Sequence, residues 1–435
     1  MSRALPDRPA STQPPVPAQP PVPASSALRR PGFRLLLAAV LVNNTGGEIT
    51  LLGYPLVAVA LLHATPGQVA LLAAAGTLAF LVIGLPAGVW VDRLERRRVL
   101  IAADISRFAL LATVPVAWWL GRLGMAQLVA VAFLTGVCRV FFDVAAQSFV
   151  PGLVGPQALM SANAALTGAN SGSQIAGRAL GGFLIQALTG PVAMGVNALT
   201  ALWSAGCVLF VRGGGRPPSA ARADVIPLHR GVRDGLRHVV RDPVLGPAAL
   251  SSSLGNLFIS ITVTMLPVVL ISEVGLSEAD VGLFFAVAGV GSVLGAIVTP
   301  VLTRGFGHGR VLWLSAALCA PLYLLLPLAG HGARLAVAAL AFLVMNLRNM
   351  IGNIILVSYR QRVTPDELLG RVNATMRFAL WGMLPVGSAL SGLIATSAGP
   401  RAALWVAAAG TSLAWIPVAL SPIATMRELP PPPSR

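Results

Sequence analysis

The sequence contains no lysine, and all 31 of its basic residues are arginine. A phosphate-binding loop of the Gly-x-x-x-x-Gly-Lys-Ser/Thr type requires a lysine, so this chain cannot use ATP through that motif. The five histidines and three cysteines are scattered along the chain. None has the spacing of a zinc site, a disulfide framework or a catalytic pair. The sequence therefore predicts no enzyme, no metal site and no cofactor.

Charge is scarce as well. Only 11% of the residues are charged and 55% are hydrophobic, whereas an ordinary soluble domain has about 25% charged residues. A chain this long and apolar cannot cover its surface with polar groups in water, so we expect it to lie in a lipid bilayer. The net charge is +16. Because the arginines cluster between apolar segments rather than on an aromatic, basic face, we expect no nucleic-acid binding.

Apolar segments long enough to cross a bilayer, which takes roughly 20 residues, recur along the chain. The sequence thus predicts an all-α membrane protein with twelve transmembrane helices, at 33–60, 67–91, 99–121, 125–149, 159–187, 191–211, 244–271, 277–303, 310–330, 334–358, 368–396 and 400–421.

Polar segments divide the chain into domains. The arginine-rich residues 212–243 are expected to form a cytoplasmic linker between two six-helix bundles, 33–211 and 244–421. Within this linker, residues 228–240 are compatible with a basic amphipathic helix on the bilayer surface. The proline-rich residues 1–32 and residues 422–435 are expected to be disordered tails.

The arginines also predict the orientation of the helices. If both ends of the chain are cytoplasmic, most loop arginines lie on the inner side, and the outer loops hold only Arg122, Arg334 and Arg401. Such an excess of basic residues marks the cytoplasmic side of a membrane protein. We therefore expect a multi-pass protein of the cell membrane with both termini in the cytoplasm.

The two halves repeat each other. Residues 154–159 (Val-x-Pro-x-x-Leu) match residues 363–368, and residues 177–182 (Gly-x-Ala-Leu-x-Gly) match residues 387–392. Parallel repeats of this kind are typical of transporters that bind their cargo near the bilayer midplane. The sequence predicts two pseudo-symmetric bundles around a central cavity.

The loop after the second predicted helix carries a recognisable motif. It reads Gly88-Val-Trp-Val-Asp92-Arg93-Leu-Glu95-Arg96-Arg97-Arg98, which resembles the signature loop of the major facilitator superfamily except that Glu95 replaces the usual glycine. Residues 104–107 (Asp-x-x-Arg) and 151–163 look like the exporter branch that includes macrolide and siderophore efflux proteins. The resemblance covers about residues 33–421 and implies a secondary transporter.

This loop also has a physical interpretation. Gly88 permits the close approach of another helix, and Asp92 can accept hydrogen bonds at a helix N-terminus. Gly88, Asp92, Arg93 and Arg97 are therefore predicted to form a gating loop that holds the bundles together in one state. The alternative is a basic anchor that only fixes topology.

Ionisable groups at membrane depth are functional candidates, because they cost several kcal/mol unless paired or solvated. Glu48 is the first candidate for a proton carrier; the alternative is a structural partner for an arginine. Arg139 and Asp143 lie four residues apart on one helix face. Arg139 stands where the superfamily resemblance implies an arginine linked to proton coupling, whereas Asp143 replaces a glycine of that pattern. A self-neutralising pair is the alternative.

Further polar and aromatic residues are candidates for the cavity. Arg178 replaces the proline of the exporter motif Gly-Pro-x-x-Gly-Gly, and either binds an anionic part of the substrate or pairs with Glu48 or Asp143. Asp104 and Arg107 are expected to form a structural pair. The predicted substrate-cavity residues are Asn44, Arg178, Asn256, Arg348, Asn349 and Trp381.

The leading functional hypothesis is proton-coupled efflux of a small amphipathic molecule, such as a drug, an antibiotic or a siderophore-like compound, by alternating access. Uptake of a small nutrient is the alternative. A non-transporting receptor or a membrane-embedded enzyme is a second alternative from another class. The expected partners are the small-molecule substrate, protons and the lipid bilayer, and we expect the protein to act as a monomer.

Overall fold

The computed structural model describes residues 27–211 and 236–430, apart from a few side chains within helices, among them those of Asp92, Asp366 and Glu367. Residues 1–26 and 431–435 of the expected tails and residues 212–235 of the expected linker lie outside the described residues. Of the amphipathic helix expected at 228–240, only the last residues are described, and residues 236–241 are helical.

The described residues are almost entirely helical and contain no strand. The first half holds α1 (Pro31–Leu56), α2 (Pro66–Arg93), α3 (Arg96–Trp119), α4 (Met125–Leu188) and α5 (Gly190–Phe210). The second half holds α7 (Leu245–Val268), α8 (Glu278–Phe306), α9 (His308–Tyr323), α10 (Ala333–Val363), α11 (Asp366–Ala398), α12 (Pro400–Leu413) and α13 (Ile416–Ala419). Short π-helices follow α1 (Val57–Leu61) and α7 (Val269–Glu273), and 3₁₀ turns form at Leu326–Leu328 and Pro422–Thr425.

The long helix α4 contains two of the predicted membrane-spanning helices. At Gly155 the backbone leaves the helical region, with φ 67° and ψ 170°, a conformation that glycine adopts at little cost. Eleven helices among the described residues are long and apolar enough to span a membrane, and one of them ends at Gly155. The part of α4 beyond Gly155 corresponds to the remaining one of the twelve predicted helices, the one expected at 159–187.

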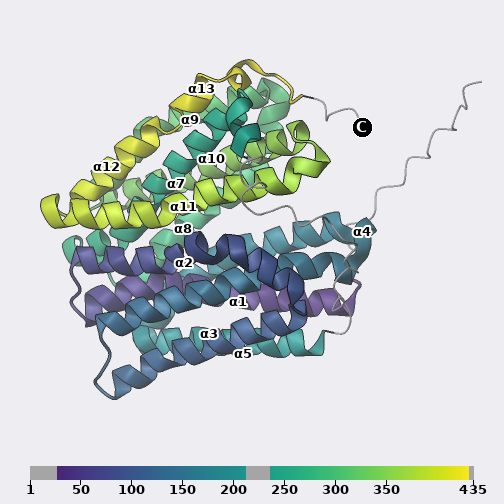
Figure 1. Cartoon of the computed structure of the whole chain (residues 1–435). Coiled ribbons are helices and arrows are strands. Elements are labelled where there is room, and N and C mark those ends of the chain that lie inside the picture. The colour runs from purple at the N-terminus through teal and green to yellow at the C-terminus, as the bar shows by residue number, and fades with distance from the viewer. Residues whose placement is uncertain (1–26, 212–235, 431–435) are drawn as a thin grey trace, which may run out of the picture.

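The helices form two bundles that lie side by side. Figure 1 shows α1–α5 in one bundle and α7–α13 in the other, and the space-filling view shows the halves meeting along one seam. Along this seam α2 packs against α11, and the second part of α4 packs against α8. A Cβ built at Gly182 would lie 2.6 Å from the Cα of Gly282. Glycines thus let the two backbones meet directly.

The predicted internal repeat is visible in the helix ends. Pro55 lies in the last turn of α1 and Pro267 in the last turn of α7, and each helix continues into a π-helix. The next helix then begins after a hydroxyl N-cap, Thr65 for α2 and Ser277 for α8. Both halves therefore have a proline, then a π-helix, then a capped helix, in the same order. The proline has no amide hydrogen, so it interrupts the backbone hydrogen bonds of the helix at equivalent places.

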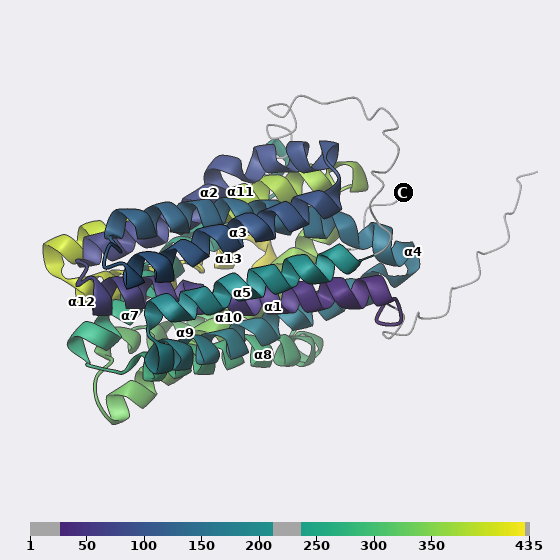
Figure 2. The ribbon, with the colours of Figure 1, turned by 90° about the horizontal axis from the view of Figure 1, so that it is seen from below.

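Within residues 27–211 and 236–430, the apolar core joins the two halves at one end of the molecule. There, where α2 and α8 begin, one cluster joins residues of both bundles, such as Leu72 and Phe284. At the opposite end each bundle has its own cluster, around Phe149 in the first half and Tyr359 in the second. Figure 2 shows the helices of both bundles running between these two ends.

Part of the expected C-terminal tail belongs to this fold. Ile423 is fully buried, and the backbone amides of His308 and Gly309 donate to the carbonyls of Arg427 and Met426. These bonds satisfy amides at the start of α9, which has no side-chain cap. Residues 422–427 therefore pack onto the end of the second bundle.

Candidate transport cavity

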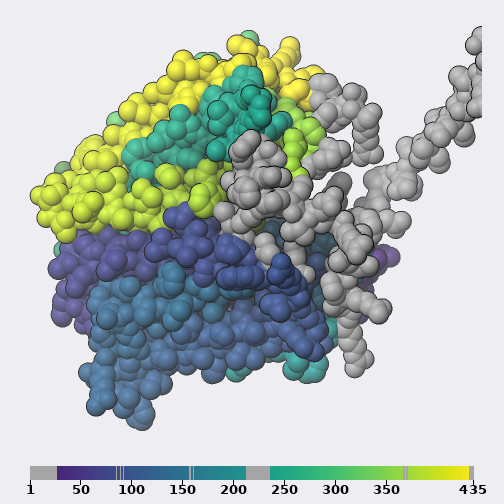
Figure 3. Space-filling model, viewed as in Figure 1, coloured from purple at the N-terminus to yellow at the C-terminus, as the bar shows by residue number. Residues whose placement is uncertain are grey.

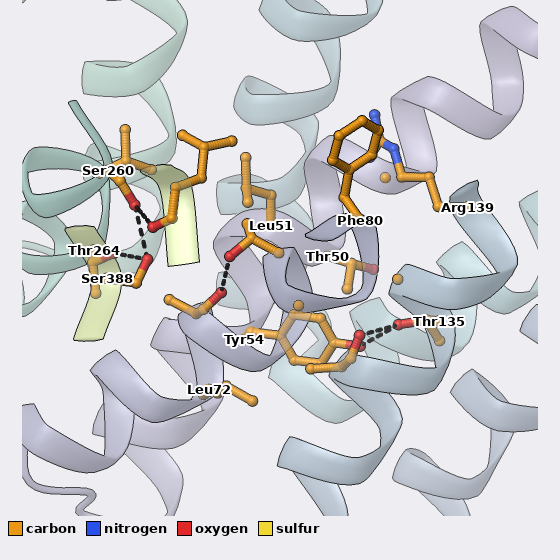
Figure 4. Close-up of a pocket in the computed structure, with 18 of the residues that line it drawn as sticks. Thr50, Leu51, Tyr54, Leu72, Phe80, Thr135, Arg139, Ser260, Thr264 and Ser388 are labelled. Carbon is orange, nitrogen blue, oxygen red and sulfur yellow. Dashed lines mark hydrogen bonds between the residues drawn. The ribbon is translucent and has the colours of Figure 1, made fainter. Parts of the chain in front are cut away.

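A cavity of about 420 Å³ lies inside the first bundle and reaches the second. This volume lies in the range of sites for drug-sized molecules. Helices α1 to α5 form most of its wall, and α7 and α11 close it from the other half (Figure 4). The wall is mostly apolar and includes Leu51, Tyr54, Leu72, Phe80, Leu111, Ile259, Trp381 and Leu384.

Hydroxyl groups of both bundles face this cavity. Tyr54 Oη lies 3.1 Å from Thr135 Oγ1 in the first bundle. In the second bundle, Ser388 Oγ lies 2.8 Å from Ser260 Oγ and 3.3 Å from Thr264 Oγ1 (Figure 4). These groups satisfy one another, so they add polarity to the wall without leaving a bare donor in an apolar site.

Arg107, Arg139 and Asp143 line the cavity, and the last two are the predicted proton-coupling residues. Both lie on α4, and Arg139 Nε is 3.9 Å from Asp143 Oδ2. Their side chains are 49% and 34% exposed although they sit in the middle of a transmembrane helix. The exposed surface therefore faces the cavity, where water or cargo can solvate the charges.

A buried polar network borders the same wall. Asn43 Nδ2 donates to Asp104 Oδ1 over 2.7 Å, and Arg107 donates through Nη1 to Asn43 Oδ1 and through Nη2 to Asn197 Oδ1, the latter over 3.3 Å. Asn197 in turn donates to Thr50 Oγ1. All four of the residues Asn43, Asp104, Arg107 and Asn197 are less than 10% exposed. Such a network helps to rigidify a core. Asp104 Oδ2 is the exception within it, because this oxygen is buried without a hydrogen bond among the described residues.

This network corrects the expectation of a direct pair. Asp104 and Arg107 are connected through Asn43, and no ion pair joins them in the described part of the chain. Asn197 is not among the residues predicted from the sequence. An asparagine in the interior of a transmembrane helix was the available signal, since a polar side chain at that depth needs a partner.

Glu48 and Arg178 form a buried ion pair. Arg178 Nε lies 2.9 Å from Glu48 Oε2, and the two side chains are 16% and 11% exposed. Gly177 allows this contact, because a Cβ there would lie 2.8 Å from the Cβ of Glu48. Of the alternatives for Arg178, the structure shows pairing with Glu48. Neither residue is part of the cavity wall.

Trp381 lines the cavity as predicted and belongs to a contact between the bundles. Its ring centroid lies 4.8 Å from that of Phe80 on α2. The guanidinium carbon of Arg377 lies 5.6 Å from the Phe80 ring and 5.5 Å from the Trp381 ring, within the range of cation–π attraction. Arg377 Nη1 also donates to Gln147 of α4 over 3.3 Å. Arg377 thus bridges the halves at the level of the cavity.

The remaining predicted cavity residues do not line it. Asn44 donates to Asn170, and Asn256 Nδ2 donates to the carbonyl of Leu380 over 2.8 Å. Arg348 has a buried Nε without a hydrogen bond among the described residues, and Asn349 is exposed. The sequence shows that these four residues lie within long apolar helices, but it does not show which face of each helix meets the cavity.

The predicted gating loop is described only in part. Arg97 Nε donates to the carbonyl of Val208 over 3.3 Å, and its Nη2 donates to that of Leu209, so it caps the end of α5. Arg93 is exposed, and a Cβ at Gly88 would meet no described atom within 4 Å. The close helix approach expected at Gly88 is therefore not seen in the described part. The side chain of Asp92 lies outside the described residues, and the gating role stays a prediction.

Comparisons with known proteins agree with this architecture. The family model of the Major Facilitator Superfamily matches residues 36–384. The chain belongs to this superfamily. It is therefore a multi-pass membrane transporter built from two pseudo-symmetric helical bundles around a central cavity, and not an enzyme.

Two relatives align over most of this chain at less than 30% sequence identity. The chain is 28% identical over 384 residues to the multidrug efflux pump Tap of Mycolicibacterium fortuitum, covering 85% of this chain and 90% of that protein. It is 26% identical over 405 residues to the uncharacterized MFS-type transporter y4rN of Sinorhizobium fredii (strain NBRC 101917 / NGR234), covering 92% and 95%.

Solved structures share the fold at low identity. The nucleoside transporter NupG superposes with a TM-score of 0.72 at 11% identity, covering 89% of this chain and 99% of that chain. A bacterial homologue of the iron transporter ferroportin in its inward-facing state gives 0.71 at 18% identity, covering 90% and 98%.

Proposed function

We propose that the protein exports a small amphipathic molecule from the cytoplasm in exchange for protons. The observation that carries this proposal is an apolar cavity that contains the charged pair Arg139 and Asp143. An apolar wall with few polar groups suits an amphipathic cargo. The relative named as a multidrug efflux pump supports export over uptake. The arginine distribution supports cytoplasmic termini.

Proton exchange is assigned in this proposal to Asp143. A coupling carboxylate must reach both the cavity and a water pathway, and Asp143 lines the cavity with 34% of its side chain exposed. Arg139 is close enough to move between Asp143 and a bound cargo. Competition between a proton and cargo for the same small site gives exchange, because the two occupants exclude each other.

Glu48 remains a second candidate for the proton carrier. Its pairing with Arg178 supports the structural alternative, in which the carboxylate holds α1 against α4. The two candidates are distinguished by their variants. Asp143→Asn should uncouple transport while the protein remains folded, and Glu48→Gln should chiefly reduce the amount of folded protein.

Everted membrane vesicles test the function directly. With a proton gradient established by the respiratory chain, addition of exported compounds from a panel of fluorescent amphipathic molecules should collapse part of the gradient only when the wild-type protein is present. Cargo accumulation should stop when an ionophore removes the pH gradient and membrane potential. Accumulation that is indifferent to both gradients, or movement only in the opposite direction, would overturn proton-coupled export.

A further inference from the structure

We propose that Arg107 and Arg139 form an anion-binding subsite above Gly47, which takes the acidic group of an amphipathic cargo. This inference rests on the proposed function, since it assumes that the cavity holds the cargo. The expected cargo has an aromatic or aliphatic body and one carboxylate or similar anionic group.

The two guanidinium groups meet at one point on α1. A Cβ built at Gly47 would lie 3.0 Å from Arg139 Nη1 and 3.5 Å from Arg107 Nη2. Because Gly47 has no side chain, both nitrogens can approach the backbone of α1 there, and a Cβ would crowd Arg139. Arg107, Arg139 and Gly47 all belong to the cavity wall, so the two guanidinium groups are within reach of a molecule in the cavity.

Donors remain available at this point. A guanidinium group has five N–H donors and no acceptor. Arg107 uses donors of Nη1 and Nη2 for Asn43 and Asn197, which fixes its position. Arg139 has no hydrogen bond to any described residue, and its contact with Asp143 at 3.9 Å is longer than a hydrogen bond.

The neighbouring acids do not cancel both charges. Asp143 lies beside Arg139, while Asp104 reaches Arg107 only through the Asn43 amide. Glu48 is already paired with Arg178. Arg377, which donates to Gln147 four residues after Asp143 on α4, adds another positive charge nearby. Two guanidinium groups this close repel each other in an apolar wall, so an anion between them is stabilised.

The rest of the wall suits the body of such a cargo. Leu51, Tyr54, Leu72 and Leu111 face the same cavity and carry no charge. Arginine binds carboxylates through paired N–H donors, which gives orientation as well as attraction. A cationic cargo would have to place its charge beside two arginines. The geometry therefore selects anions over cations of the same shape.

Three matched naphthalene compounds test this selection: 2-naphthoate, 2-naphthamide and 2-naphthylmethylammonium, which share an aromatic body and differ in charge. Binding to the purified full-length protein in nanodiscs is measured by calorimetry, with empty nanodiscs subtracted. We expect 2-naphthoate to bind at least tenfold more tightly than the amide, and the cation to bind most weakly. Equal binding of all three, or tighter binding of the cation, overturns the proposal.

Variants locate the effect at the proposed point. Arg139→Gln should reduce the preference for naphthoate over naphthamide to less than twofold, and Gly47→Ala should weaken naphthoate binding by pushing Arg139 aside. Gly53→Ala on the same helix is the matched control, because its Cβ would make only an ordinary contact of 3.5 Å with Met194. An unchanged preference in Arg139→Gln overturns the assignment.

The source of the anion is tested separately. Replacing chloride by gluconate in the buffer should not change the naphthoate preference. If millimolar chloride competes with naphthoate, the subsite holds a small inorganic ion and the assignment to cargo is overturned. Because these measurements record binding, they remain informative if the vesicle experiment finds no flux. In that case selective binding would support the subsite while the transport proposal fails.

Discussion

Asn43 connects Asp104 to Arg107 inside the first bundle. Its amide nitrogen donates to the carboxylate over 2.7 Å, and its oxygen accepts from the guanidinium group. An asparagine between an acid and a base bonds to both without bringing the two charges into contact, while Asp104 Oδ2 stays buried without a hydrogen bond among the described residues. The network therefore holds α1 to α3 while Arg107 keeps a face toward the cavity.

Removal of the Asn43 side chain should destabilise the protein. In Asn43→Ala, Asp104 and Arg107 each lose a buried partner, which costs about 1–3 kcal/mol for an unsatisfied group. We expect a lower midpoint of thermal unfolding for the purified protein. Asn44→Ala is the control, because the Asn44–Asn170 hydrogen bond lies at exposed side chains. Equal stability of the two variants would contradict this interpretation of the network.

The Glu48–Arg178 pair should show strong coupling in a double-mutant cycle. Glu48→Gln leaves Arg178 buried without its counter-ion, and loss of one partner of a buried pair costs about 3–5 kcal/mol. The double variant Glu48→Gln with Arg178→Gln should recover part of this stability, as measured by unfolding in detergent. If the double variant is stable but loses proton coupling in vesicles, Glu48 is the proton carrier and the structural interpretation is wrong.

The glycine contact between α4 and α8 should control access to the cavity. A valine at Gly182 would force α8 away, since even a Cβ would lie 2.6 Å from the Cα of Gly282. We expect the shared core to open, so that Leu72→Cys, buried in wild type, reacts faster with a membrane-impermeant maleimide. The measurement uses a background in which Cys138, Cys207 and Cys319 are replaced.

A matched valine controls for the bulk of the new side chain. Gly206→Val adds the same atoms to α5 at a position where a Cβ meets nothing within 4 Å. It should leave the labelling rate of Leu72→Cys unchanged. Equal rates in Gly182→Val and Gly206→Val would show that the glycine contact does not close the cavity.

The proposed orientation predicts which loops are accessible from outside the cell. A cysteine at Arg122, between α3 and α4, should react with an impermeant reagent in intact cells, whereas a cysteine at Arg304, at the end of α8, should react only after the membrane is opened. The opposite pattern would place the termini outside. That result would contradict the orientation on which the export proposal draws.

The sequence predicted the helices and their two-fold repeat correctly because both depend on local properties. A run of about 20 apolar residues spans the bilayer whatever its neighbours are, and the repeated motifs at 177–182 and 387–392 encode repeated packing. The break at Gly155 was predicted as a gap between helices, although the helix continues through it with one non-helical residue.

The site was predictable only in part, because sequence gives the height of a residue along a helix but not its neighbours on other helices. Trp381, a predicted cavity residue, lines the cavity, and so do Arg139 and Asp143. The proton-coupling role expected for these two stays a prediction. Arg178, another predicted cavity residue, instead pairs with Glu48, since Gly177 lets α1 and α4 approach each other there. Arg348 is likewise absent from the cavity wall.

The separate apolar clusters of the two bundles bear on whether the bundles must be covalently connected. Because each bundle encloses its own cluster at the end that carries the linker, neither bundle depends on the other for its interior there. The covalent connection should then be dispensable once both bundles lie in the same bilayer. Two polypeptides, cut within residues 212–235 and produced together, are expected to associate through the apolar cluster that contains described residues of both bundles.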